Sequence, residues 1–428
     1  MVPHLVTALS GPINELEQRI LDATPVIERW FRLEWMEHTP PLYCAVDIRN
    51  AGFKLAPVDT DLFPRGWHNL SDDVLPLAVQ AGQAAIEKIC PEARNLLIVP
   101  ASGKPSSFYL ASLARLEQIF RMAGLNVRFG SIDPAVKRSV THKLPDGEDL
   151  VFEPALRSRC RLGLKHFDPC TILLNDDLPS GAPGILEDLN EQYLLPPLQA
   201  GWSVRRMSRH FRCYEEVSKR FGKLIGIDPW LIHPLFAHCE RVDVRKPEGL
   251  DCLRENVNAV LLKLRRKYKE YGITEKPFVV LKPDNGSRGM GVMALRDAAE
   301  LTTASGKLVK ALGQLAPGGD VIIQDGVLTH ERLHDTVAEP VVYSIDRYVV
   351  GGFYRMHADA GAADNLSAPG ARYVPLAFDG RNHLPHAGAK PGASAPNRFY
   401  MYGVIARLAM VAASYELEAT DPQAEAYA

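Results

Sequence analysis

Residues 282–295 read KPDNGSRGMGVMAL, and this glycine-rich segment constrains the fold more than any other part of the chain. The apolar runs on either side of the glycines, Pro277–Leu281 and Val292–Leu295, both predict short β-strands. A glycine-rich loop between two strands is a hairpin, whereas the Walker loop and the dinucleotide-binding loop both run from a strand into a helix. The segment therefore predicts a hairpin lid, and a plain structural turn is the alternative.

Glycines in such a lid have no Cβ atom, so backbone N–H groups there can come close to a chain of phosphates. Lys282, at the end of the first strand, can place a cation on the same phosphates. The residues that we expect to bind a nucleotide in this lid are Lys282, Gly286, Ser287, Arg288, Gly289 and Gly291.

The next strand along the chain predicts the rest of a nucleotide site. Asp320–Val327 reads as a strand that ends in a short polar hinge. Backbone groups of such a hinge can contact the edge of an adenine ring, and we expect Gln324, Asp325 and Val327 to lie there.

An antiparallel hairpin is predicted further on, formed by Val341–Ile345 and Tyr348–His357 around a turn at Asp346 and Arg347. Period-2 alternation in the second strand places Arg355 near the end of the hairpin, far from the turn. Asp364-Asn365 follows, just before a Pro-Gly turn.

This order of features resembles the ATP-grasp ligases, and above all their glutathione synthetase branch. Four longer segments resemble the proteobacterial glutamate–cysteine ligase family of the ATP-grasp type, namely Cys44–Pro64, Ile227–Pro234, Ala338–His357 and Asp364–Gly370. The resemblance implies an α/β (α+β) chain with a glutathione-synthetase-like ATP-grasp fold and an N-terminal α/β domain. It also implies the ATP-dependent joining of the γ-carboxylate of L-glutamate to the amine of L-cysteine through a γ-glutamyl phosphate, the first step of glutathione biosynthesis.

Within that resemblance, Arg355, Lys282 and Asn365 are the expected catalytic residues. Mg²⁺ prefers hard oxygen ligands, and the available ones are Glu339, Asp346, Asp364 and Asn365. The chain departs from the family in two places: it has no clean Glu-x-Asn pair for the metal, and Met207 stands where the family has a lysine.

The amino-acid substrate is expected to bind in residues 47–69. Arg49 can hold a carboxylate in a bidentate fork, while Asp47 and Asp59 can accept an α-ammonium group. Further donors come from Asn50, Lys54 and Asn69. The alternative is that Arg49 and Asp59 form an internal ion pair. Two other functions stay open: a glutathione synthetase-like or other amino-acid or peptide ligase, and a non-catalytic nucleotide-binding homologue.

A length of 428 residues predicts two or three domains. Strands at 43–48, 96–99, 126–130 and 171–175 alternate with helices at 75–89 and 108–123, which predicts a mostly parallel sheet in residues 1–200. This N-terminal α/β domain would bind the substrate. A helical subdomain over 201–275, with helices at 211–224 and 253–271, and a C-terminal subdomain over 276–428, which carries the lid and ends in a helix at 399–416, would complete the ATP-grasp part.

Composition excludes several classes of protein. A net charge of −2 does not favour nucleic-acid binding. The seven cysteines contain no C-x-x-C pair, which argues against a zinc site and a disulfide framework and favours a cytoplasmic location. No signal-peptide pattern and no apolar run of about 20 residues is present, so we expect no membrane association. The family resemblance implies small-molecule substrates.

Overall fold

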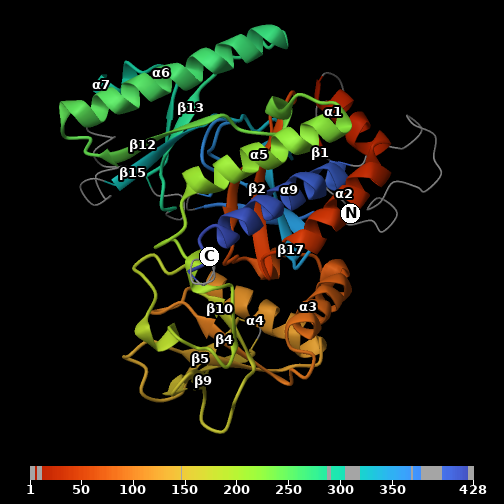
Figure 1. Ribbon diagram of the computed structural model, residues 1–428, viewed down its shortest axis with the longest axis vertical. Coiled ribbons are helices and arrows are strands. Elements are labelled where there is room, and N and C mark those ends of the chain that lie inside the picture. Colours follow the sequence, from red (N-terminus) through yellow and green to blue (C-terminus); the bar gives the residue numbers. More distant parts are fainter. Residues whose placement is uncertain are drawn as a thin grey trace.

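The computed structural model describes residues 5–6, 12–145, 147–286, 291–303, 319–367, 370–376 and 398–422. Three sheets make up its framework, with helices between and around them (Figure 1). Among the described helices, none combines the length and the apolar character needed to span a bilayer.

A six-stranded sheet forms the lower part of the molecule in Figure 1. Its strand order is β11 (Tyr193–Leu195), β10 (Thr171–Asn175), β4 (Asn95–Pro100), β5 (Asn126–Ser131), β7 (Asp149–Pro154) and β6 (Val140–Lys143). Neighbouring strands are parallel except for β6, which runs antiparallel to β7. The expectation of a mostly parallel sheet is therefore confirmed.

Helices α3 (Leu75–Ile89) and α4 (Ser107–Met122) pack their apolar faces into the core that this sheet shares with its neighbour. Ser106 caps α4 by accepting a hydrogen bond from the N–H of Tyr109 at 3.2 Å. Gly124, at φ 90°, follows the end of the helix, which is the position where a left-handed glycine terminates helices. Two short strands that follow β7 in the sequence, β8 (Leu156–Ser158) and β9 (Arg161–Gly163), form a separate antiparallel pair.

The second sheet has seven strands and is antiparallel. It contains the expected hairpin, β17 (Thr336–Ile345) and β18 (Tyr348–Met356), with Glu339 opposite Arg355. The other strands are β1 (Leu5–Val6), β16 (Arg332–Leu333), β19 (Arg372–Pro375), β2 (Tyr43–Asn50) and β3 (Leu55–Asp61).

Strand β2 lies outside the sheet in which we expected it. We expected the strand at 43–48 to belong to the N-terminal parallel sheet, but β2 pairs with β17 and β3 in the antiparallel sheet. Its partner β17 lies almost 300 residues later in the chain, and an apolar strand pattern does not specify its partner. Boundaries at residues 200 and 275 stay predictions, and β2 and β3 pack with C-terminal strands.

The third sheet carries the lid strands. Its order is β12 (Phe236–Val242), β15 (Gly319–Asp325), β13 (Val279–Pro283) and β14 (Met293–Leu295), all antiparallel. β13 and β14 are the two strands predicted around the glycine-rich segment, and they pair as a hairpin. Together with the seven-stranded sheet, this arrangement matches the ATP-grasp architecture that the sequence resemblance implied.

Helix α6 (Pro247–Glu270) covers the third sheet, and the short helix α7 (Glu300–Thr303) follows β14. A disulfide joins Cys239 of β12 to Cys252 of α6. No disulfide framework was expected, and this single pair forms because a strand and the helix packed on it bring together two cysteines 13 residues apart.

Helix α9 (Arg398–Glu418) lies at the centre of the molecule beside α5 (Met207–Ile225), and it also contacts β2 and β3 (Figure 1). Its residues from Met401 to Ala406 are all buried. Helices α1 (Pro12–Asp22) and α2 (Thr24–Glu37) pack on the same core. Five single turns of 3-10 helix complete the described elements: Trp67–Asn69, Asp72–Val74, Gly184–Leu186, Leu198–Ala200 and Pro229–Leu231.

Candidate active site

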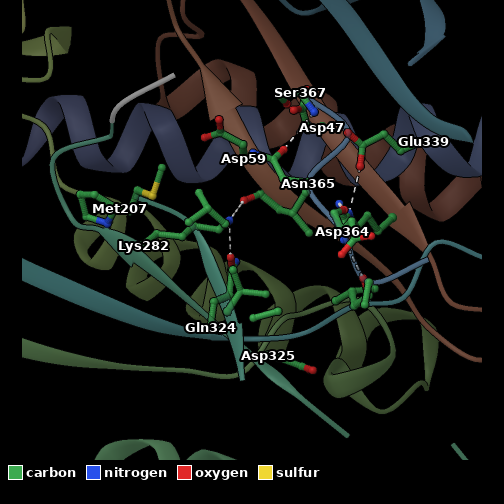
Figure 2. Close-up of a pocket in the computed structure, with 18 residues that line it drawn as sticks. Asp47, Asp59, Met207, Lys282, Gln324, Asp325, Glu339, Asp364, Asn365 and Ser367 are labelled. Atoms are coloured by element: carbon green, nitrogen blue, oxygen red, sulfur yellow. Dashed lines mark hydrogen bonds and ion pairs between the residues drawn. The ribbon is translucent and has the colours of Figure 1, made fainter. Parts of the chain in front are cut away.

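A pocket of about 200 Å³ lies between the lid sheet and the seven-stranded sheet (Figure 2). Its walls come from β2, β3, β13, β14, β15 and β17, from the N-terminus of α5, and from the loop after β18. The predicted site residues that line it are Asp47, Arg49, Asp59, Lys282, Gln324, Asp325, Val327, Glu339, Asp364 and Asn365. The fold therefore brings together side chains from four separate parts of the sequence.

Lys282 enters the pocket from β13, close to Met207 (Figure 2). Its ammonium group donates to Gln324 Oε1 at 2.7 Å and to the carbonyl of Val58 at 2.9 Å. Burial lowers the pKa of Lys282 to about 8, although the carboxylates of Asp59 and Asp47 act in the opposite direction. These two acceptors fix the position of the ammonium group in the pocket.

Two carboxylates of the pocket lining, Asp47 and Glu339, pair with Arg355, which itself lies outside the lining. Arg355 donates to Asp47 Oδ2 at 2.5 Å, to Glu339 Oε1 at 3.0 Å and to Ser367 Oγ at 3.0 Å. Burial by itself lowers the pKa of Arg355, but Asp47 and Glu339 raise it above its ordinary value. Arg355 is thus a fixed positive charge directly behind two carboxylates of the pocket.

Arg49 shares Glu339 with Arg355, donating from Nε to Glu339 Oε2 at 2.9 Å. Its other nitrogens donate to the carbonyl of Val327 at 3.3 Å and to the carbonyl of Asp364 at 2.6 Å. The alternative of an ion pair between Arg49 and Asp59 was therefore wrong, because the partner of Arg49 is Glu339. Since all three nitrogens donate hydrogen bonds within the chain, Arg49 stabilises the wall of the pocket. It is not free to bind a substrate carboxylate in a bidentate pair.

Asp47 and Asp59 face each other on the adjacent strands β2 and β3. Burial raises the pKa of Asp59, and the neighbouring Asp47 carboxylate raises it further. Two carboxylates in one pocket can hold an ammonium group or a cation, and the one with the raised pKa can also accept a proton.

Several predicted residues lie outside the pocket lining. Lys54 forms a buried ion pair with Asp325 Oδ2 at 2.5 Å, and Asn50 donates to Glu331 at 2.9 Å, so both have structural partners. Asn69 lies in the turn Trp67–Asn69, and its Nδ2 has no hydrogen-bond partner among the described residues.

Asp346 does not join the other predicted metal ligands. It lies at the β17–β18 turn, 3.4 Å from Lys88 of α3. Seven residues of extended chain separate it from Glu339, a span of about 20 Å. The alternation that brings Glu339 opposite Arg355 thus places Asp346 at the wrong end of the hairpin.

Of the predicted lid residues, Ser287, Arg288 and Gly289 lie outside the described residues. Gly286 has φ 56°, and a Cβ atom there would lie 2.5 Å from the ring of Trp202. Gly291 has φ 73°. Both positions need glycine, for the backbone conformation and, at Gly286, also for space.

Sequence reasoning missed the residue that attaches the lid to α5. Asp284 accepts hydrogen bonds from the N–H of Ser208 at 2.6 Å and from its hydroxyl at 2.7 Å, and its carbonyl accepts from the N–H of Met207. The sequence signal for this contact was an acidic residue directly after Lys282-Pro283. Its partner could not be identified from sequence, because Ser208 lies more than 70 residues earlier. His238, Asp284 and Asp320 lie close enough to hold a cation, yet both oxygens of Asp284 already serve Ser208.

Residues suited to a magnesium ion do meet in the pocket. Glu339, Asp364 and Asn365 line the same space and offer carboxylate and amide oxygens, the donor type that Mg²⁺ prefers. The donor type therefore suits the expected metal, with Asp346 excluded, although both oxygens of Glu339 already accept hydrogen bonds from Arg49 and Arg355.

A family model described as glutamate–cysteine ligase matches residues 17–417 of the chain. A solved structure from Methylobacillus flagellatus KT, provisionally named a gamma-glutamylcysteine synthetase, is 48% identical to it with a TM-score of 0.90. That match covers 98% of this chain and 100% of the other.

Two further solved structures are much less similar. D-alanyl-alanine synthetase A from Vibrio cholerae is 12% identical with a TM-score of 0.33, over 74% of this chain and 81% of the other. A glutathione synthetase-like effector from Globodera pallida is 8% identical with a TM-score of 0.37, over 85% and 84%. Likenesses this weak carry no argument. No curated protein matches the chain significantly.

Proposed function

Because the chain belongs to the glutamate–cysteine ligase family, we propose that it joins the γ-carboxylate of L-glutamate to the amine of L-cysteine. The reaction consumes ATP and is the first step of glutathione biosynthesis. The observation that carries this proposal is the shared pocket, in which Lys282 faces the network of Arg355, Asp47 and Glu339.

In the first step, an oxygen of the substrate γ-carboxylate attacks the γ-phosphorus of ATP. An oxygen–phosphorus bond forms, the bond to the β-phosphate oxygen breaks, and ADP leaves. Phosphoryl transfer depends mainly on positioning and on charge stabilisation. Lys282 and the lid backbone would hold the phosphates, and Gln324 and Val327 would contact the base. Magnesium, when bound, neutralises charge on the phosphate oxygens, and Glu339, Asp364 and Asn365 would hold it.

In the second step, the amine of cysteine attacks the acyl carbon and inorganic phosphate leaves. Arg355, paired with Asp47 and Glu339, would supply the positive charge that stabilises the oxyanion of the tetrahedral intermediate. The amine must lose a proton, and Asp59, with its raised pKa, is a carboxylate of the pocket that can accept it.

Met207 favours a second candidate function. It lines the pocket beside Lys282, at the place where the family is expected to have a second cation. A thioether cannot hold a phosphate, so a non-catalytic nucleotide-binding homologue is the alternative. We also propose a cytoplasmic protein that acts on small molecules and does not bind nucleic acid, in keeping with its net charge of −2.

The decisive experiment measures ADP release from the purified full-length chain with MgATP. The amino-acid mixtures are L-glutamate alone, L-cysteine alone, both together, and γ-glutamylcysteine with glycine. Release that requires glutamate and cysteine together is the expected result, whereas release only with the dipeptide and glycine would identify a glutathione synthetase. No release in any mixture, from folded protein, would support the non-catalytic alternative.

Lys282→Ala is the matched test of the nucleotide site. The variant should stay folded and lose ADP release by about 100-fold or more, since one preorganised charge is worth that much in such sites. Chelation of magnesium should abolish release, and added magnesium should restore it. Full activity in Lys282→Ala would contradict the assignment of the site.

A further inference from the structure

Arg65 lies in the loop after β3, where its guanidinium group is held but incompletely partnered. Its Cζ atom lies 4.6 Å from the centre of the Tyr109 ring. Among the described residues, its Nη2 atom has no hydrogen-bond partner, and the nearest carboxylate oxygen, Asp177 Oδ1, is 3.9 Å away. A guanidinium group presents five N–H donors in a rigid fork, and a buried donor without an acceptor costs free energy that a bound anion would recover.

Tyr109 fixes the place of Arg65 at one edge of the parallel sheet. The tyrosine hydroxyl donates to the carbonyl of Asn175, the last residue of β10, at 2.8 Å. The same hydroxyl accepts from the N–H of Ala101, just after β4, at 2.9 Å. Arg65 therefore lies at the carboxyl ends of two neighbouring parallel strands, the place where such sheets bind their ligands.

Acidic side chains lie near the guanidinium group. Burial and the carboxylates of Asp59 and Asp177 together raise the pKa of Asp61 to about 6, although Arg65 acts in the opposite direction. Burial and Asp177 also raise the pKa of Asp176. One arginine thus faces an excess of carboxylates, so the cluster can accept a cation as well as an anion.

The cluster and the pocket share strand β3. Asp59 lines the pocket, and Asp61 lies two residues further along β3, so both side chains are on the same face of the strand. Two residues of a strand span about 7 Å. This is comparable with the length of a short amino acid that has a carboxylate at each end.

From this arrangement we propose that Arg65, with Asp61 and Asp177, binds the α-carboxylate and α-ammonium groups of the amino acid whose side-chain carboxylate is phosphorylated in the pocket. Arg65 takes the carboxylate, and the two aspartates take the ammonium group. Asn69, whose Nδ2 also lacks a partner, can supply a second donor from the turn after Arg65. The inference rests on the proposed function and names the recognition site of its acceptor substrate.

The test pairs variants with substrate analogues that each lack one group. In 4-aminobutanoate the α-carboxylate of glutamate is missing, and in glutarate the α-ammonium group is missing. The variants are Arg65→Ala, Arg65→Lys and Asp177→Asn. The control is Arg115→Ala, a nearby arginine of α4 that pairs with the exposed Asp72.

We expect the full-length enzyme to prefer L-glutamate over 4-aminobutanoate by about 100-fold or more in kcat/KM, because the site would leave Arg65 unpaired with the analogue. Arg65→Ala should lower kcat/KM for glutamate by a similar factor and leave the value for 4-aminobutanoate within about threefold. Asp177→Asn should lower kcat/KM for glutamate and for 4-aminobutanoate, and should leave kcat/KM for glutarate unchanged. Arg65→Lys, which keeps the charge without the fork, should fall between the wild type and Arg65→Ala, while the KM for ATP stays unchanged in every variant.

Calorimetric binding of L-glutamate separates this inference from the proposed function. If the wild type binds glutamate and Arg65→Ala binds it at least tenfold more weakly, with ATP binding unchanged, the site is supported even if no ligase turnover is found. Equal glutamate affinity in the wild type and Arg65→Ala overturns the inference. An equal loss for all three substrates would mean that Arg65 only supports the fold, and that result also overturns it.

Discussion

Lys282 shares its pocket with several carboxylates, yet burial outweighs them and lowers its pKa to about 8 from an ordinary value of 10.5. The side chain can thus titrate near the pH at which many enzymes are assayed. A lysine that must hold phosphates is useful only while it is charged, so the charge state of this one side chain has a measurable consequence.

We expect kcat/KM for ATP to fall as the pH rises through about 8, because this ratio reports the ionisation of the free enzyme. Lys282→Arg keeps its charge at all these pH values and should lose that basic limb, even if its maximal rate is lower. An unchanged limb in the arginine variant would assign the titration to another group.

Stability should respond in the opposite direction. Between pH 8 and 10.5 the unfolded chain binds a proton at Lys282 that the folded chain does not bind, so the contribution of this group to the free energy of unfolding rises with pH. Urea unfolding of the wild type and Lys282→Met at pH 7.5 and 9.5 checks this: the free energy of unfolding of the wild type should rise relative to that of the variant at the higher pH. A fall of the wild type relative to the variant would contradict the lowered pKa.

Lys54 was predicted to bind substrate, but its structural partner makes it a test of stability. Its ion pair with Asp325 is buried on both sides, with side-chain exposures of 1% and 2%. Lys54→Met leaves the Asp325 carboxylate buried without a counter-charge, which should cost about 3–5 kcal/mol. The double variant Lys54→Met with Asp325→Leu should recover part of that loss. Urea unfolding measures both, and a loss in Lys54→Met below ~1 kcal/mol would show that the pair is unimportant.

At the scale of elements, one contact joins the lid to a helix. Asp284, just after β13, accepts hydrogen bonds from Ser208 at the N-terminus of α5. A carboxylate at this position accepts a hydrogen bond from a free backbone N–H of the first helical turn, as a capping residue does. Its negative charge also interacts favourably with the positive end of the helix dipole. Since Lys282 is only two residues away, the same contact fixes the root of the lid and the position of the lysine.

Asp284→Ala should therefore raise the KM for ATP by about tenfold, which corresponds to ~1.4 kcal/mol, and lower stability by about 1 kcal/mol through the lost cap. Asp284→Asn keeps one acceptor oxygen and should restore part of both losses. The control is Asp243→Ala, which removes a carboxylate that accepts the N–H of Arg245 in an exposed loop. A stability loss in Asp284→Ala with no change in the KM for ATP would mean that the contact does not position the lid.

At the scale of the whole molecule, α9 connects parts of the chain that are far apart in sequence. Its Glu416 lies 2.9 Å from Arg205 and 3.2 Å from His210 of α5, and all three side chains are almost completely buried. Burial by itself raises the pKa of Glu416, but the Arg205 guanidinium holds it below its ordinary value. Burial lowers the pKa of His210.

Both shifts have the same sign for stability. The neutral His210 contributes stability above its ordinary pKa of 6.5, and the ionised Glu416 contributes stability above 4.5; both contributions are lost as the pH falls below those values. We therefore expect the free energy of unfolding to decrease steadily from pH 7 to pH 4.5.

Glu416→Gln should cost about 3–5 kcal/mol at pH 7, because it leaves the buried Arg205 without its counter-charge. The penalty should become smaller near pH 4, where the wild type also begins to lose the carboxylate charge. Urea unfolding at pH 7, 5 and 3.5 makes the comparison, with the exposed Glu418→Gln as the control. A penalty that is the same at every pH would show that charge pairing is not its cause.

The sequence by itself determined the elements that depend on near neighbours in the chain. Apolar periodicity placed α3, α4, α6 and α9 to within a few residues, except at the start of α6, and the glycines between two apolar runs identified the lid hairpin. Local order along the chain also placed Lys282, Gln324, Asp364 and Asn365 in what proved to be one pocket. These signals survive in sequence because helices, hairpins and turns are specified by residues that lie close together.

Only the tertiary structure decided which distant groups meet. In the folded chain β2 pairs with β17, Arg49 forms an ion pair with Glu339, and Lys54 forms one with Asp325. Asp346 lies at the hairpin turn beside Lys88, away from the other candidate metal ligands. An arginine or a carboxylate looks the same in sequence whether its partner is a substrate, a backbone carbonyl or a buried side chain nearly 300 residues away. Those choices are made by packing, which settles a buried charge on whichever partner the fold brings within reach.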